Sequence, residues 1–215
     1  MALALLPRRV ALLALLRSVA ASSARFLPPN AARAAGGATE VAVTLGGAFL
    51  LREHVLDARY IPTESMVPTL HVGDLLLLDK VSVRVRPPAR GEIVCFKPPP
   101  ALVAKQPALG AGSVCMVKRI VALAGDEVRV QKGRLFVNGE RVAESYVPER
   151  MQYRMGRRKV PPGHVFVLGD NRNYSFDSHV WGSLDQTLLI GRPLCRYWPL
   201  RRLAAGKRFR TASCS

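Results

Sequence analysis

The segment Pro62-Thr63-Glu64-Ser65-Met66-Val67-Pro68 holds a serine between two prolines. Proline disfavours a helix interior and a central strand, so the pattern predicts a stiff, irregular segment around Ser65. A hydroxyl held in this way could attack a substrate as a nucleophile, and a plain connecting loop would have the same composition. Ser65 therefore needs a partner before any chemistry can be assigned to it.

A serine alcohol is a weak nucleophile at neutral pH and needs a base within hydrogen-bond reach. Lys118 is a candidate because it lies in the apolar run of residues 114–121, VCMVKRIV. Strand alternation would put Lys118 on the same side as Met116 and Ile120. Burial there would lower the lysine pKa from about 10.4 toward 7, so that a neutral amine could accept a proton. Alternatively, Lys118 extends from a sheet edge into water.

A third group of polar residues follows an apolar strand pattern, in the block GDNRNYSFDSHVWG of residues 169–182. Its composition predicts an Asx-rich loop whose side chains bond their own backbone. Ser175 and Asp177 carry the hydroxyl and carboxylate that could orient a buried lysine amine. His71 and His179 are alternative bases, because a Ser-His-Asp triad assembles in space. Ser65 nevertheless lacks the flanking glycines of a GxSxG nucleophile elbow.

The elements that would position these residues are mostly short strands. Apolar runs that predict strands occupy residues 75–78, 92–96, 114–122, 127–131, 134–137, 165–168 and 188–198. Lys132-Gly133 and Asn138-Gly139 are two-residue turn signals and predict a hairpin or meander. Residues 97–113 and 148–163 contain several prolines and glycines and predict exposed loops. No long helical pattern follows residue 52, so we expect a mainly β, antiparallel fold.

The N-terminal part differs from the rest in composition. Residues 1–38 contain five arginines, many alanines and leucines and no acidic residue, which predicts an organelle transit peptide that is later removed. A secretory signal or a plain basic tail is the alternative. Residues 41–51 form an uncharged run of 11 residues, whereas a membrane span needs about 20. We expect a membrane-anchor helix over residues 39–56 that spans, tilts or only inserts.

The formal net charge is +17, and no zinc finger, RNP-type strand or basic heptad helix favours nucleic acid. An anionic membrane surface is the better partner. The stretch from Arg192 to Arg210 has seven basic and no acidic residues and could rest on lipid, or it could be a solvated tail.

The four cysteines, Cys95, Cys115, Cys195 and Cys214, show no CxxC spacing. This argues against a zinc site and against a dense disulfide scaffold. Cys95 and Cys115 are expected to be small, buried apolar residues inside strands.

Taken in order, the motifs resemble type I signal peptidases, membrane-bound serine proteases with a Ser/Lys dyad. The matching residues are Ser65-Met66 with Pro68-Thr69, Gly73-Asp74, Lys118-Arg119-Ile120-Val121 with Gly125-Asp126, and the 169–182 block. They cover roughly residues 41–200. The amino-acid sequence of residues 171–182 is most similar to that of the plastid thylakoidal processing peptidases. His179 stands where many bacterial relatives have arginine.

The resemblance implies a nucleophile at Ser65, a base at Lys118 and an oxyanion hole from Thr63 and the Ser65 N–H. It further implies support of the lysine by Ser175 and Asp177, a substrate contact at Met66, and no metal or cofactor. The expected substrates are precursor proteins with Ala-X-Ala-like cleavage sites at a lipid bilayer. Chloroplast thylakoid is the expected location, with the mitochondrial inner membrane as the alternative.

The same resemblance implies a partly barrel-like catalytic domain over residues 57–203, followed by a basic tail over 204–215. A non-enzymatic alternative is an inactive paralogue that binds the membrane surface. The presence of both Ser65 and Lys118 weighs against it.

Overall fold

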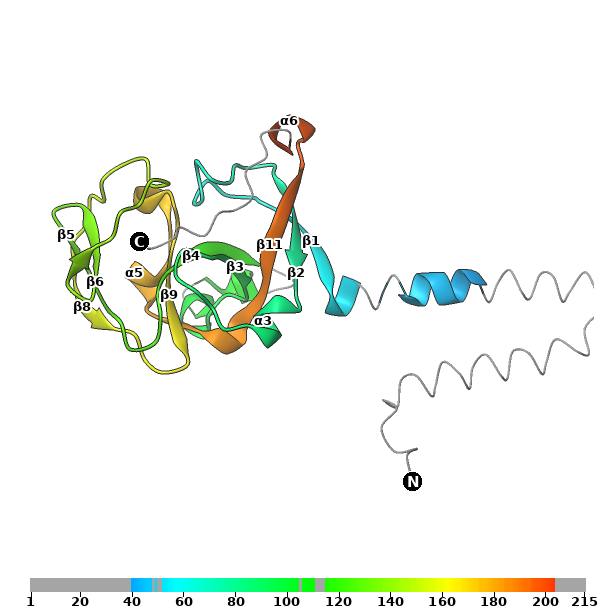
Figure 1. The fold of residues 1–215 in the computed structure, drawn as a ribbon, viewed down its shortest axis with the longest axis horizontal. Coiled ribbons are helices and arrows are strands. Elements are labelled where there is room, and N and C mark those ends of the chain that lie inside the picture. The colour runs from blue at the N-terminus through cyan, green and yellow to red at the C-terminus, as the bar shows by residue number, and fades with distance from the viewer. Residues whose placement is uncertain (1–39, 48, 50–51, 105, 111–114, 204–215) are drawn as a thin grey trace, which may run out of the picture. The chain divides into compact units, whose positions relative to one another are not determined.

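The computed structural model describes residues 40–47, 49, 52–104, 106–110 and 115–203 (Figure 1). The chain divides into two compact units, residues 1–53 and residues 54–215. In the first unit, the described residues are helical. No helix in the described part of the chain is long and apolar enough to cross a membrane. The predicted transit peptide, residues 1–38, lies outside the described residues.

The predicted anchor helix ends earlier than expected. Helical backbone stops at residue 54, and strand β1 begins at Leu56. The prediction that the helix reaches residue 56 was therefore wrong at this end. The run LDARY was missed as a strand because its two polar residues, Asp57 and Arg59, hide its apolar pattern.

The second unit is mainly antiparallel β, as predicted. Its larger sheet has seven strands in the order β1-β2-β11-β3-β4-β9-β10 (Figure 1). These strands are β1 (Leu56–Tyr60), β2 (Leu75–Asp79), β3 (Ile93–Phe96), β4 (Met116–Ala122), β9 (His164–Leu168), β10 (Leu184–Asp185) and β11 (Leu189–Trp198). Every pairing between them is antiparallel. The order places β4, which carries Lys118, inside the sheet between β3 and β9.

A smaller sheet has four strands in the order β7-β6-β5-β8. They are β5 (Glu127–Gln131), β6 (Arg134–Val137), β7 (Glu140–Arg141) and β8 (Met155–Lys159). The two turn signals lie where the sequence predicts them. Lys132 and Gly133 have φ of 52° and 70°, and Asn138 and Gly139 have φ of 54° and 87°. Positive φ at both central residues is what a type I′ hairpin turn requires.

Both predicted loops contain regular structure. Residues 97–113 include α4 (Pro100–Val103) and the 3-10 turn η2 (Pro107–Gly110). Within residues 148–163 the structure has strand β8, so the prediction of an exposed loop was wrong there. Only Met155 of β8 is buried, and the basic run that follows is exposed at the edge of the sheet. A strand at the edge of a sheet can form with few buried apolar side chains. Its exposed charges also keep it from pairing with a strand of another molecule.

The remaining described helices of the second unit are single turns, of which four link strands and the last follows β11. They are α3 (Ser82–Val85), η3 (Arg172–Tyr174), α5 (Ser178–Trp181), η4 (Gln186–Leu188) and α6 (Leu200–Leu203). The core falls into three clusters of buried apolar side chains. One lies under the smaller sheet around Val128 and Phe166, and the other two lie around Met66 and around Ile120.

Cys95 in β3 and Cys115, just before β4, form a disulfide with their Cα atoms 6.1 Å apart. The prediction that both are simply buried apolar residues was therefore wrong on their pairing, although Cys95 is fully buried. Sequence spacing does not reveal that β3 and β4 are neighbours, and this adjacency brings the two residues together. Cys195 is a free thiol, and Cys214 lies outside the described residues.

The basic C-terminal stretch is only partly available to lipid. Arg192 is buried and forms an ion pair with Glu92 at 3.0 Å. Arg196 pairs with the fully buried Asp74 at 3.0 Å. These two arginines hold β11 to its neighbours, so they do not form a lipid-facing surface. The predicted basic tail of residues 204–215 lies outside the described residues.

Candidate active site

Ser65 lies on the connection between β1 and β2, residues 61–74, which closes on itself at its base. The Ile61 N–H donates to the Asp74 carbonyl at 2.9 Å, and the Gly73 N–H donates to the Ile61 carbonyl at 3.0 Å. Met66 and Leu70 are buried in the core and hold the connection down. The irregular, well-anchored segment predicted around Ser65 is therefore present.

Lys118 lies in the middle of β4 and is 4% exposed. Its Nζ donates a hydrogen bond to the Ser65 Oγ. Burial lowers the pKa of the Lys118 amine to about 8, against the opposing charges of Asp177 and Asp170. The alternative interpretation, a lysine extending into water, is wrong, because β4 is buried on both faces.

Thr63 adds a second hydroxyl beside the serine. Its Oγ1 lies 3.3 Å from the Ser65 Oγ, and either atom could be the donor. In the described part of the chain the Ser65 N–H donates no hydrogen bond. The structure thus brings two donors close to the Ser65 hydroxyl, its own N–H and the Thr63 hydroxyl.

The predicted loop over residues 169–182 lies against the serine segment. The Asn171 N–H donates to the Ser65 carbonyl at 3.1 Å, and the Asn171 side-chain amide donates to the Glu64 carbonyl at 3.2 Å. Gly169 lies so close that an added Cβ would collide with the Ser65 carbonyl and the Ser175 side chain. The loop and the nucleophile segment are therefore packed together through their backbones.

Asp177 is fully buried and acts on Lys118 through its charge. Its carboxylate accepts from the Gly169 N–H at 2.9 Å and from the His179 N–H at 3.2 Å, which caps α5. The Ser175 Oγ is buried and has no hydrogen-bond partner among the described residues. The structure thus places Ser175 and Asp177 near the dyad, but it shows no hydrogen bond from either one to Lys118.

Neither candidate histidine contacts Ser65. The His179 Nδ1 lies 2.7 Å from the Asp177 Oδ1, and the His179 ring stacks on Tyr153 with centroids 4.2 Å apart. The His71 Nδ1 is buried and has no hydrogen-bond partner among the described residues. The hydroxyl of Ser65 is instead surrounded by Lys118 and Thr63, so the geometry favours a lysine base over a histidine base.

Met66, for which the resemblance implies a substrate contact, is a buried residue, and that contact stays a prediction. It is 1% exposed and packs in the core cluster with Ile61 and Leu70, which are also buried. These side chains connect the serine segment to the core. Among the described residues no three His, Cys, Asp or Glu side chains group as metal ligands would.

A buried ion pair next to Lys118 was missed from the sequence. The Arg119 Nε and Nη2 donate to the Asp170 carboxylate at 2.8 Å and 2.6 Å, and Arg119 lies 3.9 Å from the ring centroid of Tyr146. The Thr69 hydroxyl also donates to Asp170, at 2.5 Å. The sequence did contain a signal for this ion pair, namely two basic residues in succession inside an apolar strand. If such a strand is buried on both faces, at least one of the two charges needs an acidic partner.

The site thus joins a serine hydroxyl to a buried lysine amine, with a threonine hydroxyl beside them. Residues 37–198 match the family described as "Signal peptidase, peptidase S26", and the chain belongs to this family.

Its relatives include bacterial and plant enzymes. The chain is 44% identical over 153 residues to Signal peptidase I of Leptolyngbya laminosa, covering 71% of this chain and 74% of that protein. It is 46% identical over 153 residues to Probable signal peptidase I-2 of Synechocystis sp., covering 71% and 68%. It is 47% identical over 152 residues to Thylakoidal processing peptidase 1, chloroplastic, of Arabidopsis thaliana, covering 70% of this chain and 44% of that protein. The chain thus spans less than half of the plant relative.

Proposed function

We propose that this protein is a serine endopeptidase that removes N-terminal signal peptides from precursor proteins, with Ser65 as nucleophile and Lys118 as general base. The observation that carries the proposal is the buried Lys118 amine bonded to the Ser65 hydroxyl, with its pKa lowered to about 8. A base that titrates close to the working pH combines a useful neutral fraction with enough basicity to take the serine proton.

In the first step the neutral Lys118 amine takes the Ser65 proton while the Oγ attacks the scissile carbonyl. The negative charge that forms on the carbonyl oxygen is stabilised by the Ser65 N–H and the Thr63 hydroxyl. Lys118 then gives its proton to the leaving amine, which breaks the peptide bond and leaves an ester on Ser65. In the second step Lys118 takes a proton from water, the hydroxide attacks the ester, and the serine regains a proton from the ammonium.

Support for the lysine comes from the surrounding charges. Asp177 and Asp170 both raise the pKa of Lys118 against the effect of burial. Asp170 is itself neutralised by Arg119, and Asp177 is bonded to two backbone N–H groups. Ser175 is a further positioning candidate, because its unbonded hydroxyl lies beside Gly169 and could turn toward the amine when substrate excludes water.

We propose that the substrates carry small residues, typically alanine, one and three positions before the cut. The plastid relatives support a thylakoid location and thylakoid-transfer peptides as substrates. The mitochondrial inner membrane is the alternative, and a fluorescent fusion of residues 1–40 distinguishes the two. Membrane association is part of this proposal and would rest on the residue 39–56 segment and on chain outside the described residues.

The test is cleavage of a purified precursor by the full chain in detergent, with the new N-terminus identified by mass spectrometry. We expect a single cut after an Ala-X-Ala sequence, and we expect a bulky residue in place of either alanine to abolish the cut. Failure to cut any precursor of this kind, or equal cutting of the bulky variants, would overturn the proposed specificity.

A further inference from the structure

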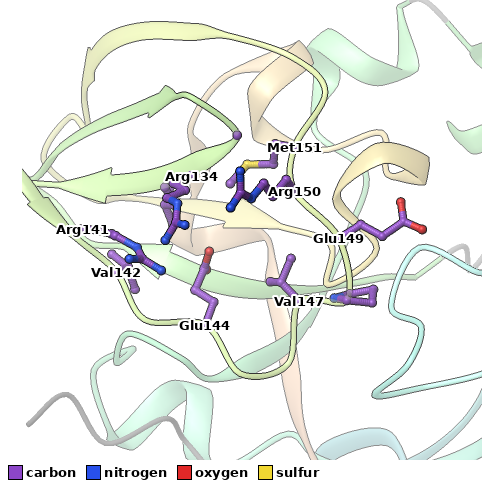
Figure 2. Close-up of a pocket in the computed structure, with 11 residues that line it drawn as sticks. Arg134, Arg141, Val142, Glu144, Val147, Glu149, Arg150 and Met151 are labelled. Atoms are coloured by element: carbon purple, nitrogen blue, oxygen red, sulfur yellow. The ribbon is translucent and has the colours of Figure 1, made fainter.

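A pocket of about 220 Å³ opens beside the smaller sheet, and its lining includes no residue of the candidate active site (Figure 2). One side of the pocket is formed by the start of β6 and the end of β7. The other side is formed by part of the connection between β7 and β8, which runs over residues 142–154. Such a volume suits a single compact group, because pockets for drug-sized ligands begin at about 300 Å³.

Three arginines line this pocket: Arg134, Arg141 and Arg150. Figure 2 shows Arg134 and Arg141 near one another and Arg150 beside Met151. None of the three forms an ion pair with a described acidic residue. The positive charges of Arg141 and Arg150 lower the pKa of Arg134. Arg134 is therefore close enough to Arg141 and to Arg150 to be repelled by both.

The two acidic residues of the pocket already have hydrogen-bond partners outside the three arginines. Glu144 bonds through both carboxylate oxygens to the buried Arg172, at 2.8 Å and 2.5 Å, and also accepts from the Tyr146 hydroxyl. Glu149 accepts from the Asn173 amide at 3.4 Å, and Figure 2 shows its side chain pointing away from the arginines. With three arginines and two glutamates in its lining, the pocket keeps a formal excess of one positive charge.

The floor of the pocket includes apolar side chains of the core. Leu135 and Met151 are buried at 1% and 5% exposure and belong to the core of this part of the molecule. Arg141 and Arg150 are exposed and Arg134 is half-buried, so an anion can reach all three guanidinium groups from solvent. Planar guanidinium groups also match the oxygens of phosphate in pairs, which a lysine amine cannot do.

We propose that the pocket of Arg134, Arg141 and Arg150 binds a phosphate group carried by a small molecule or by a lipid headgroup. The three guanidinium groups bind the phosphate oxygens, and the apolar floor accommodates the first carbon atoms attached to it. The proposal does not depend on the peptidase function, since no residue of the Ser65 site takes part.

The first experiment measures binding of inorganic phosphate to the full chain in detergent by calorimetry, at constant ionic strength with chloride as the balancing anion. We expect saturable binding to the wild type and at least tenfold weaker binding to Arg134→Gln, Arg141→Gln and Arg150→Gln. Arg134→Lys keeps the charge but loses the paired geometry, so we expect an intermediate affinity. The matched control is Arg154→Gln, which removes an exposed arginine that does not line the pocket.

The second experiment measures how much protein is recovered bound to phosphatidylcholine vesicles with and without phosphatidic acid. It compares the wild type with the triple arginine-to-glutamine variant. Loss of phosphatidic-acid-dependent recovery in the variant assigns the site to a lipid headgroup, and loss of free phosphate binding alone assigns it to a soluble ligand. Equal melting temperatures without phosphate show that the variants are folded. If the triple variant equals wild type in both arms, the proposal is wrong.

Discussion

The Lys118 Nζ donates a hydrogen bond to the Ser65 Oγ across 53 positions of sequence. Each residue is held by a different part of the main sheet. Lys118 is fixed by pairing of β4 with β3 and β9, and Ser65 by a connection that is closed at its base and buried through Met66. The relative position of the two groups therefore depends on the packing of the sheet and not on a flexible loop.

The pH dependence of turnover follows from Lys118. Only the neutral amine can accept the serine proton, and burial lowers its pKa to about 8. We expect kcat/KM for precursor cleavage to rise about tenfold for each pH unit below 8 and to level off above it. A profile that is flat from pH 6 to 9, with chemistry shown to limit the rate, would contradict this role.

Asp177 should set the midpoint of that profile. Its negative charge raises the pKa of Lys118, so Asp177→Asn should move the midpoint to lower pH. Asp185→Asn is the matched control, because Asp185 caps the turn η4 as Asp177 caps α5 but is not among the groups that shift Lys118. A shift to higher pH, or an equal shift in both variants, would show that Asp177 does not act through its charge.

Gly169 should not tolerate a side chain. A Cβ there would collide with the Ser65 carbonyl and the Ser175 side chain. The Ser65 carbonyl belongs to the backbone and cannot move aside as a flexible side chain could. We expect Gly169→Ala to lower the free energy of unfolding by about 1–3 kcal/mol and to reduce kcat strongly. Gly156→Ala is the control, since a Cβ at that position meets nothing within 4 Å. Equal activity of the two variants would show that the loop and the serine segment are not tightly coupled.

The disulfide between Cys95 and Cys115 closes a loop with a sequence separation of 20 residues. A loop of this size stabilises a protein by about 3 kcal/mol, which corresponds to roughly 5–10 °C in melting temperature. We therefore expect Cys95→Ser/Cys115→Ser to melt several degrees lower than the wild type without reductant. Cys195→Ser removes the free thiol and should melt like the wild type. Identical melting of the double variant would mean that the bond does not contribute.

Much of the strand content could be predicted from the sequence, because it depends on local pattern. The structure also brings Ser65 and Lys118 into hydrogen-bond contact, and their catalytic roles stay predictions. Short apolar runs and two-residue turns mark most strands of the two sheets. Strand β8 was not predicted because only one of its residues is buried. Strand β1 was not predicted because polar residues interrupt its apolar pattern.

What the sequence could not supply was pairing between distant segments. The Arg119–Asp170 ion pair joins residues 51 positions apart, and the disulfide depends on which strands are neighbours. Burial of Met66 also depends on tertiary packing, which is why a residue expected at the substrate lies in the core. The hydrogen bonds of Asp177 to backbone N–H groups and to His179 likewise depend on how the 169–182 loop folds, and its support of the lysine stays a prediction.

The most direct test of the Ser65/Lys118 dyad is single-turnover cleavage of a precursor by four variants of the full chain. Ser65→Ala and Lys118→Met remove the reacting groups, whereas Ser145→Ala and Lys97→Met change an exposed serine and an exposed lysine. We expect a loss of at least about 1000-fold for each of the first pair and wild-type rates for the second pair. Wild-type cleavage by a folded Ser65→Ala or Lys118→Met variant would contradict the dyad.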